Sequence, residues 1–95
     1  MRMISRRQIV EFVRKHPTTK PNLEQWYRVV KQTNWQSLVE VKRVYPHADL
    51  VGWRTVFNFA GNNFRLVAHI NYRRQAVFIL AILTHAAYSK EEWEE

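Results

Sequence analysis

The sequence predicts an α+β fold in which N-terminal helices pack on one face of a small, mainly antiparallel sheet of three to four strands. Apolar residues recur at helical spacing up to Tyr45, whereas from Leu50 onward they alternate with polar residues, as strands do. The chain has 95 residues, of which 46% are hydrophobic and 14% aromatic, which is enough for one modest core. We therefore expect one domain, covering residues 1–95.

Two helices near the N-terminus are predicted by their apolar stripes. Ser5 and Gln8 have the spacing of a capping box, in which both side chains bond free backbone amides, so the first helix should begin at Ser5 and end before Pro17. A second helix is expected over about residues 21–33. The two stripes, each with spacing i, i+3, i+4, i+7, consist of Ile9, Phe12, Val13 and His16, and of Leu23, Trp26, Tyr27 and Val30.

Capping-box spacing also marks the start of two shorter helices. Ser37 and Glu40 predict a third helix, which a proline at position 46 should end. Ser89 and Glu92 have the same spacing, so a terminal helix is expected over residues 89–95.

The second half of the chain has the pattern of an antiparallel meander. Strands are expected over residues 50–59, 64–72 and 77–83, with a Gly- and Asn-rich turn at 60–63. The last of these strands is apolar on both faces, which is typical of a strand covered on both sides. Met1–Ile4 is expected to form a short edge strand. In the strand over 50–59, one face should carry Trp53, Thr55, Phe57 and Phe59.

The protein is strongly basic. Fifteen Lys and Arg residues against eight Asp and Glu residues give a formal net charge of +7 and a pI near 10.3. Residues 51–89 contain four arginines and no carboxylate. Such a chain attracts polyanions and releases counterions from phosphates, so nucleic acid is the leading expected partner. The longest apolar run has eight residues, too few to cross a membrane, so we expect a cytoplasmic protein with no membrane partner.

Several kinds of site are excluded by residue types that the sequence lacks. The chain has no cysteine, which excludes disulfides, thiolate metal sites and cysteine nucleophiles. No carboxylate lies between Asp49 and Glu91, which argues against a hard-metal site or a pair of catalytic carboxylates on the sheet. The four histidines lack metal-ligand spacing, and two glycines nine residues apart cannot form a phosphate loop. We expect neither a metal nor a cofactor.

Six polar residues of the predicted sheet and its end could carry chemistry, namely Arg54, Asn58 and four more. Arg65 and His69 share one face of a strand, about 13 Å apart at ~3.3 Å per residue. His85 ends the last strand, and Tyr88 follows it at helical spacing. Cleavage of RNA by its own 2′-hydroxyl can use arginine, histidine and tyrosine without a metal or a carboxylate. All four side chains are also compatible with structural roles, so the residues alone indicate a basic nucleic-acid-binding domain.

Two motifs resemble a known family. Residues 56–67 read VFNFAGNNFRLV and residues 84–88 read THAAY. They match the VFN-x-x-GN-x-x-RLV and TH-x-x-Y patterns of the HigB family of bacterial toxins, within the wider RelE-like ribonuclease group. The resemblance covers nearly the whole chain, and the motifs occur in the family's order.

The resemblance implies an mRNA interferase that in many members acts on messages at the ribosome. It implies a helix-turn-helix antitoxin partner of the HigA type, with operator DNA contacted only through that antitoxin. By resemblance, Arg65 braces the scissile phosphate, while His85 and Tyr88 form a pair for proton transfer or stacking. Further RNA contacts are expected at Lys42, Arg54, Asn62, His69 and Lys90.

Two other functions are open from the sequence. The chain could be a non-catalytic module that binds RNA or the ribosome through the same basic face. It could instead be a basic structural subunit whose charge serves an acidic protein partner, in which case charge reversal at Arg73 and Arg74 should disrupt only that complex.

Overall fold

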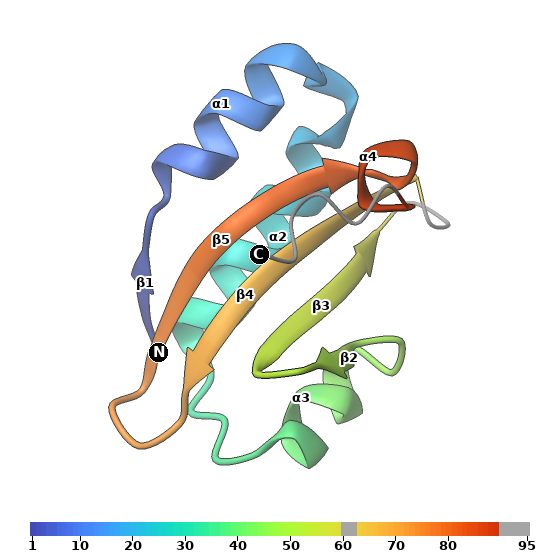
Figure 1. Cartoon of the computed structure of the whole chain (residues 1–95). Coiled ribbons are helices and arrows are strands. Elements are labelled where there is room, and N and C mark those ends of the chain that lie inside the picture. Colours follow the sequence, from blue (N-terminus) through green and yellow to red (C-terminus); the bar gives the residue numbers. More distant parts are fainter. Residues whose placement is uncertain (60–62, 90–95) are drawn as a thin grey trace.

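The computed structural model describes residues 1–59 and 63–89 (Figure 1). The described elements, in chain order, are β1 (Arg2–Ile4), α1 (Arg7–Lys15), the 3-10 helix η1 (Pro17–Thr19), α2 (Lys20–Gln32), α3 (Leu38–Val44), β2 (Asp49–Val51), β3 (Arg54–Phe59), β4 (Phe64–Asn71), β5 (Ala76–Thr84) and α4 (His85–Ser89). Most of the predicted turn over 60–63 and all but the first residue of the predicted helix over 89–95 lie outside the described residues.

The strands form one sheet in the order β1-β5-β4-β3-β2. β1 runs parallel to β5, and the other neighbours are antiparallel. The predicted α+β class and the N-terminal edge strand are confirmed. The described sheet has five strands where three to four were expected, because the second edge strand, β2, is separate from β3.

The single strand expected over residues 50–59 is wrong. The chain forms β2 and β3, joined by a tight turn at Gly52 and Trp53. Gly52 has φ +63, a left-handed backbone that glycine adopts without the steric cost of a side chain. Trp53 therefore lies in the turn and is 56% exposed, instead of sharing a strand face with Phe57.

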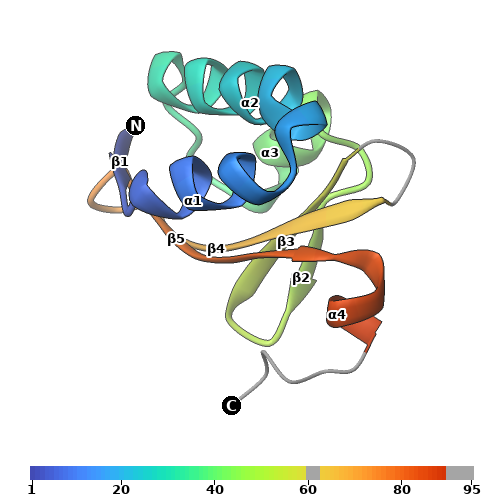
Figure 2. The same cartoon turned by 90° about the horizontal axis from the view of Figure 1, so that it is seen from above.

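Helices α1, α2 and α3 lie on one face of the sheet, and α4 lies on the other side (Figure 2). Phe57 of β3 is fully buried at the centre of the core. Its ring contacts Trp26, Trp35 and Tyr45, with centroids 5.4, 6.4 and 5.4 Å away. The helical stripes predicted from the sequence therefore pack against the strand that carries Phe57.

The predicted capping boxes are largely wrong. Ser5 has φ 74, which is not the extended backbone typical of a capping serine. The N-cap position of α1 falls on Arg6, which has a helical backbone and makes no side-chain capping bond. Ser37 is the extended N-cap of α3 as predicted, but its side chain makes no capping bond. Glu40 instead accepts a hydrogen bond from the backbone N–H of Gln36, at 3.1 Å.

The face of the sheet opposite α1, α2 and α3 is called the outer face below. It carries the side chains that alternate with the core-facing ones. From β3, β4 and β5 these are Arg54, Val56, Asn58, Arg65, Val67, His69, Asn71, Phe78, Ala81 and Leu83. This part of the outer face contains no carboxylate.

A β-bulge in β5 decides which way the end of that strand faces. Val67 pairs with Ala81 and Ala68 pairs with Ile79, so Leu80 has no partner on β4. The extra residue reverses the alternation of β5. Odd-numbered residues therefore point to the outer face after the bulge, and this register brings His85 to the outer face at the start of α4.

Tyr45 gives the fold a testable dependence on alkaline pH. Burial raises the pKa of its phenol above the ordinary value of 10.0. The phenol therefore ionises at a lower pH in the unfolded chain than in the folded protein. The contribution of the neutral Tyr45 to the free energy of unfolding is complete below pH 10.0 and is lost as the pH rises through the folded-state pKa. We expect urea unfolding above this pH to show a smaller loss of stability in Tyr45→Phe than in the wild type. Equal losses of stability in the two proteins would contradict the raised pKa of Tyr45.

Candidate functional site

Arg65 lies at the centre of a hydrogen-bonded cluster on the outer face. Its Cα pairs with that of Asn58 across β3 and β4, which places the two side chains next to each other. The Nε–H of Arg65 donates to Oδ1 of Asn58 at 2.5 Å. The Nδ2 of Asn58 donates to the backbone carbonyl of His47 at 2.9 Å. Asn58 thus ties the guanidinium to the loop before β2.

His85 contacts the other end of the same guanidinium. Nη1 of Arg65 and Nδ1 of His85 are 2.9 Å apart. A guanidinium can only donate, so Nδ1 must accept, and the neutral ring then carries its proton on Nε2. The imidazole therefore has the lone pair of Nδ1 directed at Arg65.

Tyr88 completes the cluster, and the local sequence explains its position. The hydroxyl of Thr84 accepts a hydrogen bond from the backbone N–H of Ala87 at 3.3 Å, which is the N-cap contact of a helix. α4 thus starts at His85, and residues three apart on a helix share a side. The Tyr88 ring lies against Arg65, and the Cζ atom of Arg65 is 4.4 Å from the centroid of the Tyr88 ring.

The guanidinium of Arg65 is the cation of the cluster, and its described partners are all uncharged groups. Arg65 bonds an amide, an imidazole and a phenol ring, and no carboxylate pairs with it among the described residues. The described ion pair is Arg7–Glu11, on α1. Within residues 1–59 and 63–89, no three His, Asp or Glu side chains lie close enough together to hold a metal ion. A guanidinium without an acidic partner is suited to bind a phosphate.

The other described residues that the sequence predicts as RNA contacts do not lie in the Arg65 cluster. Arg54 and His69 also lie on the outer face, where both contact Trp53 and not Arg65. Lys42 is exposed on α3, on the helical side of the sheet, so the structure does not bring it to the cluster (Figure 2). The remaining two, Asn62 and Lys90, lie outside the described residues.

Sequence reasoning gave no role to three residues that shape the outer face. Asn58 was among the polar residues that could carry chemistry but received no role, although the strand register makes it the cross-strand partner of Arg65. Thr84 was read as part of a motif and not as a helix cap. Trp53 was placed on the same strand face as Phe57. The first two could have been found from the hairpin pairing and the capping preference of threonine.

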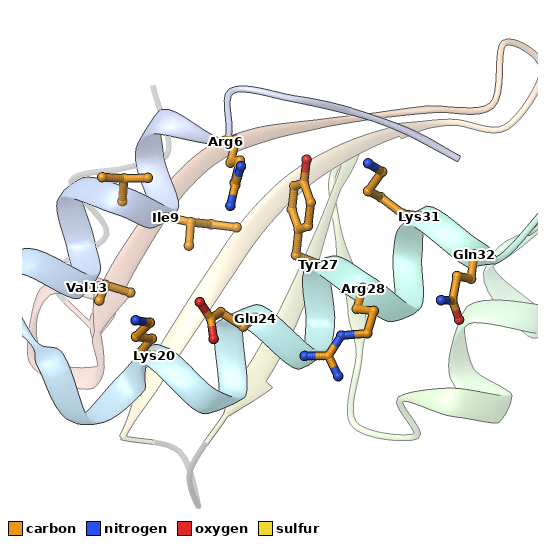
Figure 3. Close-up of a pocket in the computed structure, with 10 residues that line it drawn as sticks. Arg6, Ile9, Val13, Lys20, Glu24, Tyr27, Arg28, Lys31 and Gln32 are labelled. Atoms are coloured by element: carbon orange, nitrogen blue, oxygen red, sulfur yellow. The ribbon is translucent and has the colours of Figure 1, made fainter.

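A groove on the helical side is separate from the cluster. It lies between α1 and α2 and has a volume of about 800 Å³ (Figure 3). Apolar side chains such as Ile9 and Val13 line it together with the cations Arg6, Lys20 and Arg28. Because these helices cover the face of the sheet opposite Arg65, the groove is not part of the candidate site.

Comparison with known proteins assigns the chain to a family. Residues 19–91, which include the whole cluster, match the model of the HigB toxin family, described as a RelE-like toxic component of a toxin–antitoxin system. The chain belongs to the HigB toxin family. It is 33% identical over 93 residues to the mRNA interferase HigB of Escherichia coli O6:H1, covering 95% of this chain and 90% of that protein.

Further HigB relatives agree with this assignment. The mRNA interferase toxin HigB of Escherichia coli K12 is 25% identical over 91 residues, covering 93% of this chain and 88% of that protein. The protein named mRNA interferase HigB in Shigella flexneri matches to the same extent. The resemblance to the HigB family inferred from the sequence motifs is therefore confirmed. Among the described residues, no helix is long and apolar enough to span a membrane.

Proposed function

We propose that this HigB-family toxin is a metal-independent endoribonuclease that cleaves mRNA at the Arg65 cluster. The observation that carries the proposal is the position of one guanidinium between an imidazole and a phenol, on strands β3 to β5 that present no carboxylate on this face. The mRNA interferase names of its relatives agree with this chemistry. The structure supports a site for one ribose–phosphate linkage because all three groups can reach the same small ligand.

In the proposed reaction, the 2′-oxygen of RNA attacks the adjacent phosphorus and the bond to the 5′-oxygen breaks. The products are a 2′,3′-cyclic phosphate and a 5′-hydroxyl. Negative charge accumulates on the equatorial phosphate oxygens in the transition state, and Arg65 donates hydrogen bonds to them. Asn58 holds Nε of Arg65, so the guanidinium is oriented before the substrate arrives.

His85 provides the proton transfer in this scheme. When a phosphate takes the Nη1 donor of Arg65, the Nδ1 lone pair of His85 becomes available to accept the 2′-hydroxyl proton. The resulting imidazolium then returns a proton to the departing 5′-oxygen, so protons and charges balance. Tyr88 stacks with Arg65 and orients the base next to the linkage, or assists the transfer through its hydroxyl.

The partners follow from the same proposal. We propose that cleavage takes place in the cytoplasm on messages held by the ribosome. We also propose that the cognate antitoxin is a helix-turn-helix protein of the HigA type and that operator DNA is reached only through it. Affinity co-purification of the protein with a co-expressed helix-turn-helix protein of the HigA type tests the second statement. Independent migration of the two proteins would contradict it.

The function is tested by adding the purified protein to a translation reaction and mapping the 5′ ends of the message. We expect new 5′ ends that depend on the protein. Binding to ribosomes or RNA without new ends would instead support the non-catalytic RNA-binding module. If the protein neither binds RNA at moderate salt nor produces ends, its charge serves a protein partner and the proposal is wrong.

Asn58 should act as a positioning residue for Arg65. In Asn58→Ala the guanidinium loses its contact with the loop before β2, and we expect kcat for message cleavage to fall by about 10- to 100-fold with a much smaller change in KM. Asn71→Ala is the matched control, because Asn71 lies on β4 on the same face of the sheet and, within the part of the chain that the structure describes, its side chain accepts a hydrogen bond only from the backbone N–H of Arg74. A larger change in KM than in kcat would assign Asn58 to RNA binding.

A further inference from the structure

A second cluster of aromatic and cationic side chains lies on the outer face, further along β4 from Arg65. Trp53 is 56% exposed, although tryptophan is a large and largely apolar side chain. The guanidinium carbon of Arg54 lies 4.5 Å from its ring centroid. The His69 ring packs edge-on against Trp53, with centroids 5.3 Å apart, and stacks with Phe78 at 5.9 Å. We call these four residues the Trp53 platform.

The backbone fixes the geometry of the Trp53 platform. The left-handed turn at Gly52 presents Trp53 from the β2–β3 hairpin, and Arg54 is the first residue of β3. His69 and Phe78 are cross-strand partners on β4 and β5. The Trp53 ring contacts Arg54 and His69, and His69 is in turn held by Phe78. A ring held in this way loses little conformational entropy when it binds a ligand, so the exposed indole is already arranged as a binding surface.

The chemistry of the Trp53 platform favours a nucleobase. A flat π-face next to a guanidinium stacks with any base, and such contacts are common in proteins that bind unpaired RNA. The Nδ1 of His69 is buried and has no hydrogen-bond partner among the described residues, so the contacts that His69 is seen to make are ring contacts with Trp53 and Phe78. An acidic protein segment would use the guanidinium but would leave the exposed indole face without a matching group.

We propose that the Trp53 platform binds an unpaired nucleobase one or two nucleotides from the linkage held at Arg65. This inference rests on the proposed function, because it uses the same RNA strand. His69 and Arg65 lie on one face of β4, four residues or about 13 Å apart at ~3.3 Å per residue, so a strand can reach both. Strands β3, β4 and β5 present no carboxylate on the outer face between them, and Asp49 lies on the edge strand β2.

The test measures RNA binding with a probe that cannot be cleaved. The probe is a short, unpaired, fluorescently labelled oligoribonucleotide with 2′-O-methyl groups throughout. We expect Trp53→Ala to weaken binding by about 5- to 100-fold, because stacking on an aromatic residue has that effect per base. Trp53→Phe should retain most of the affinity. Leu50→Ala is the matched control, since Leu50 is also 56% exposed on the same hairpin but has no ring.

Abasic probes then locate the stacked base. Removing one base at a particular position should weaken binding to the wild type and should have no further effect on Trp53→Ala. The slope of affinity against salt should be the same for both proteins, because no charge is lost. Equal affinities of Trp53→Ala, Leu50→Ala and the wild type would overturn the Trp53 platform while leaving cleavage at Arg65 intact. Failure of all the proteins to bind the probe or to cleave messages would overturn the proposed function itself.

Discussion

Replacing Arg65 by alanine should abolish message cleavage while leaving the fold intact. The side chain of Arg65 contacts Asn58, His85 and Tyr88. Loss of one preorganised donor to a transition state lowers a rate by about 10²–10³, and Arg65→Ala also removes the contacts that orient His85. We expect at least that loss in the initial rate of cleavage, and no growth arrest when the variant is expressed.

Two further variants show whether a positive charge at position 65 is sufficient for cleavage. Arg65→Lys keeps the positive charge, but an ammonium cannot bond Asn58 and His85 in the fixed fork of a guanidinium. We therefore expect it to be almost as inactive as Arg65→Ala. Arg73→Ala removes an exposed arginine from the β4–β5 turn and should remain active. A folded Arg65→Ala protein that cleaves messages at the wild-type rate would contradict the assigned role.

Replacing His85 by glutamine should reduce kcat by about 10²–10⁴ if the imidazole transfers the proton. The amide oxygen of glutamine can still accept a hydrogen bond from Arg65, but the side chain cannot take up and return a proton. KM for the message should therefore change little. The comparison is made from initial rates in the same translation reaction, at message concentrations above and below KM.

The control for His85 is His47→Gln, because His47 is exposed and contributes only its backbone carbonyl to the cluster. It should retain full activity. A loss below tenfold in His85→Gln would mean that the imidazole only positions Arg65. The base would then have to be another group, and the proton path proposed here would be wrong.

Much of the fold could be predicted because the core depends on periodic apolar residues. Trp26 was identified from the helical stripe of α2, and it packs against Phe57 as the stripe requires. The turn at Gly52 could not be found in this way, since the residues around it keep the partial alternation of a strand. The tight reversal depends on one positive φ angle, which glycine permits but does not require.

The orientation of His85 shows a second limit of sequence reasoning. Residues 76–83 are all apolar, so their pattern does not say which side chains face the helices. The bulge at Leu80 shifts the register by one residue, and a one-residue shift turns every later side chain to the opposite face. Only the structure shows that His85 meets Arg65 on the outer face.

The motif reasoning was more informative about the site than periodicity was. The THAAY ending placed His85 and Tyr88 three residues apart on a helical turn, and the structure brings both to Arg65. The motifs could not show that Lys42 lies away from the cluster, because the side of the sheet on which α3 packs depends on tertiary contacts. Asn58 needed the strand register, which fixes its position across from Arg65.

The most direct test of attack by the 2′-hydroxyl uses a message with a single 2′-deoxyribose at a mapped cleavage position. We expect cleavage at that linkage to be lost while neighbouring sites are still cut, and the wild-type products to end in a 2′,3′-cyclic phosphate and a 5′-hydroxyl. Cleavage at the 2′-deoxy linkage at the normal rate would show that another nucleophile attacks, and would contradict the mechanism assigned to Arg65 and His85.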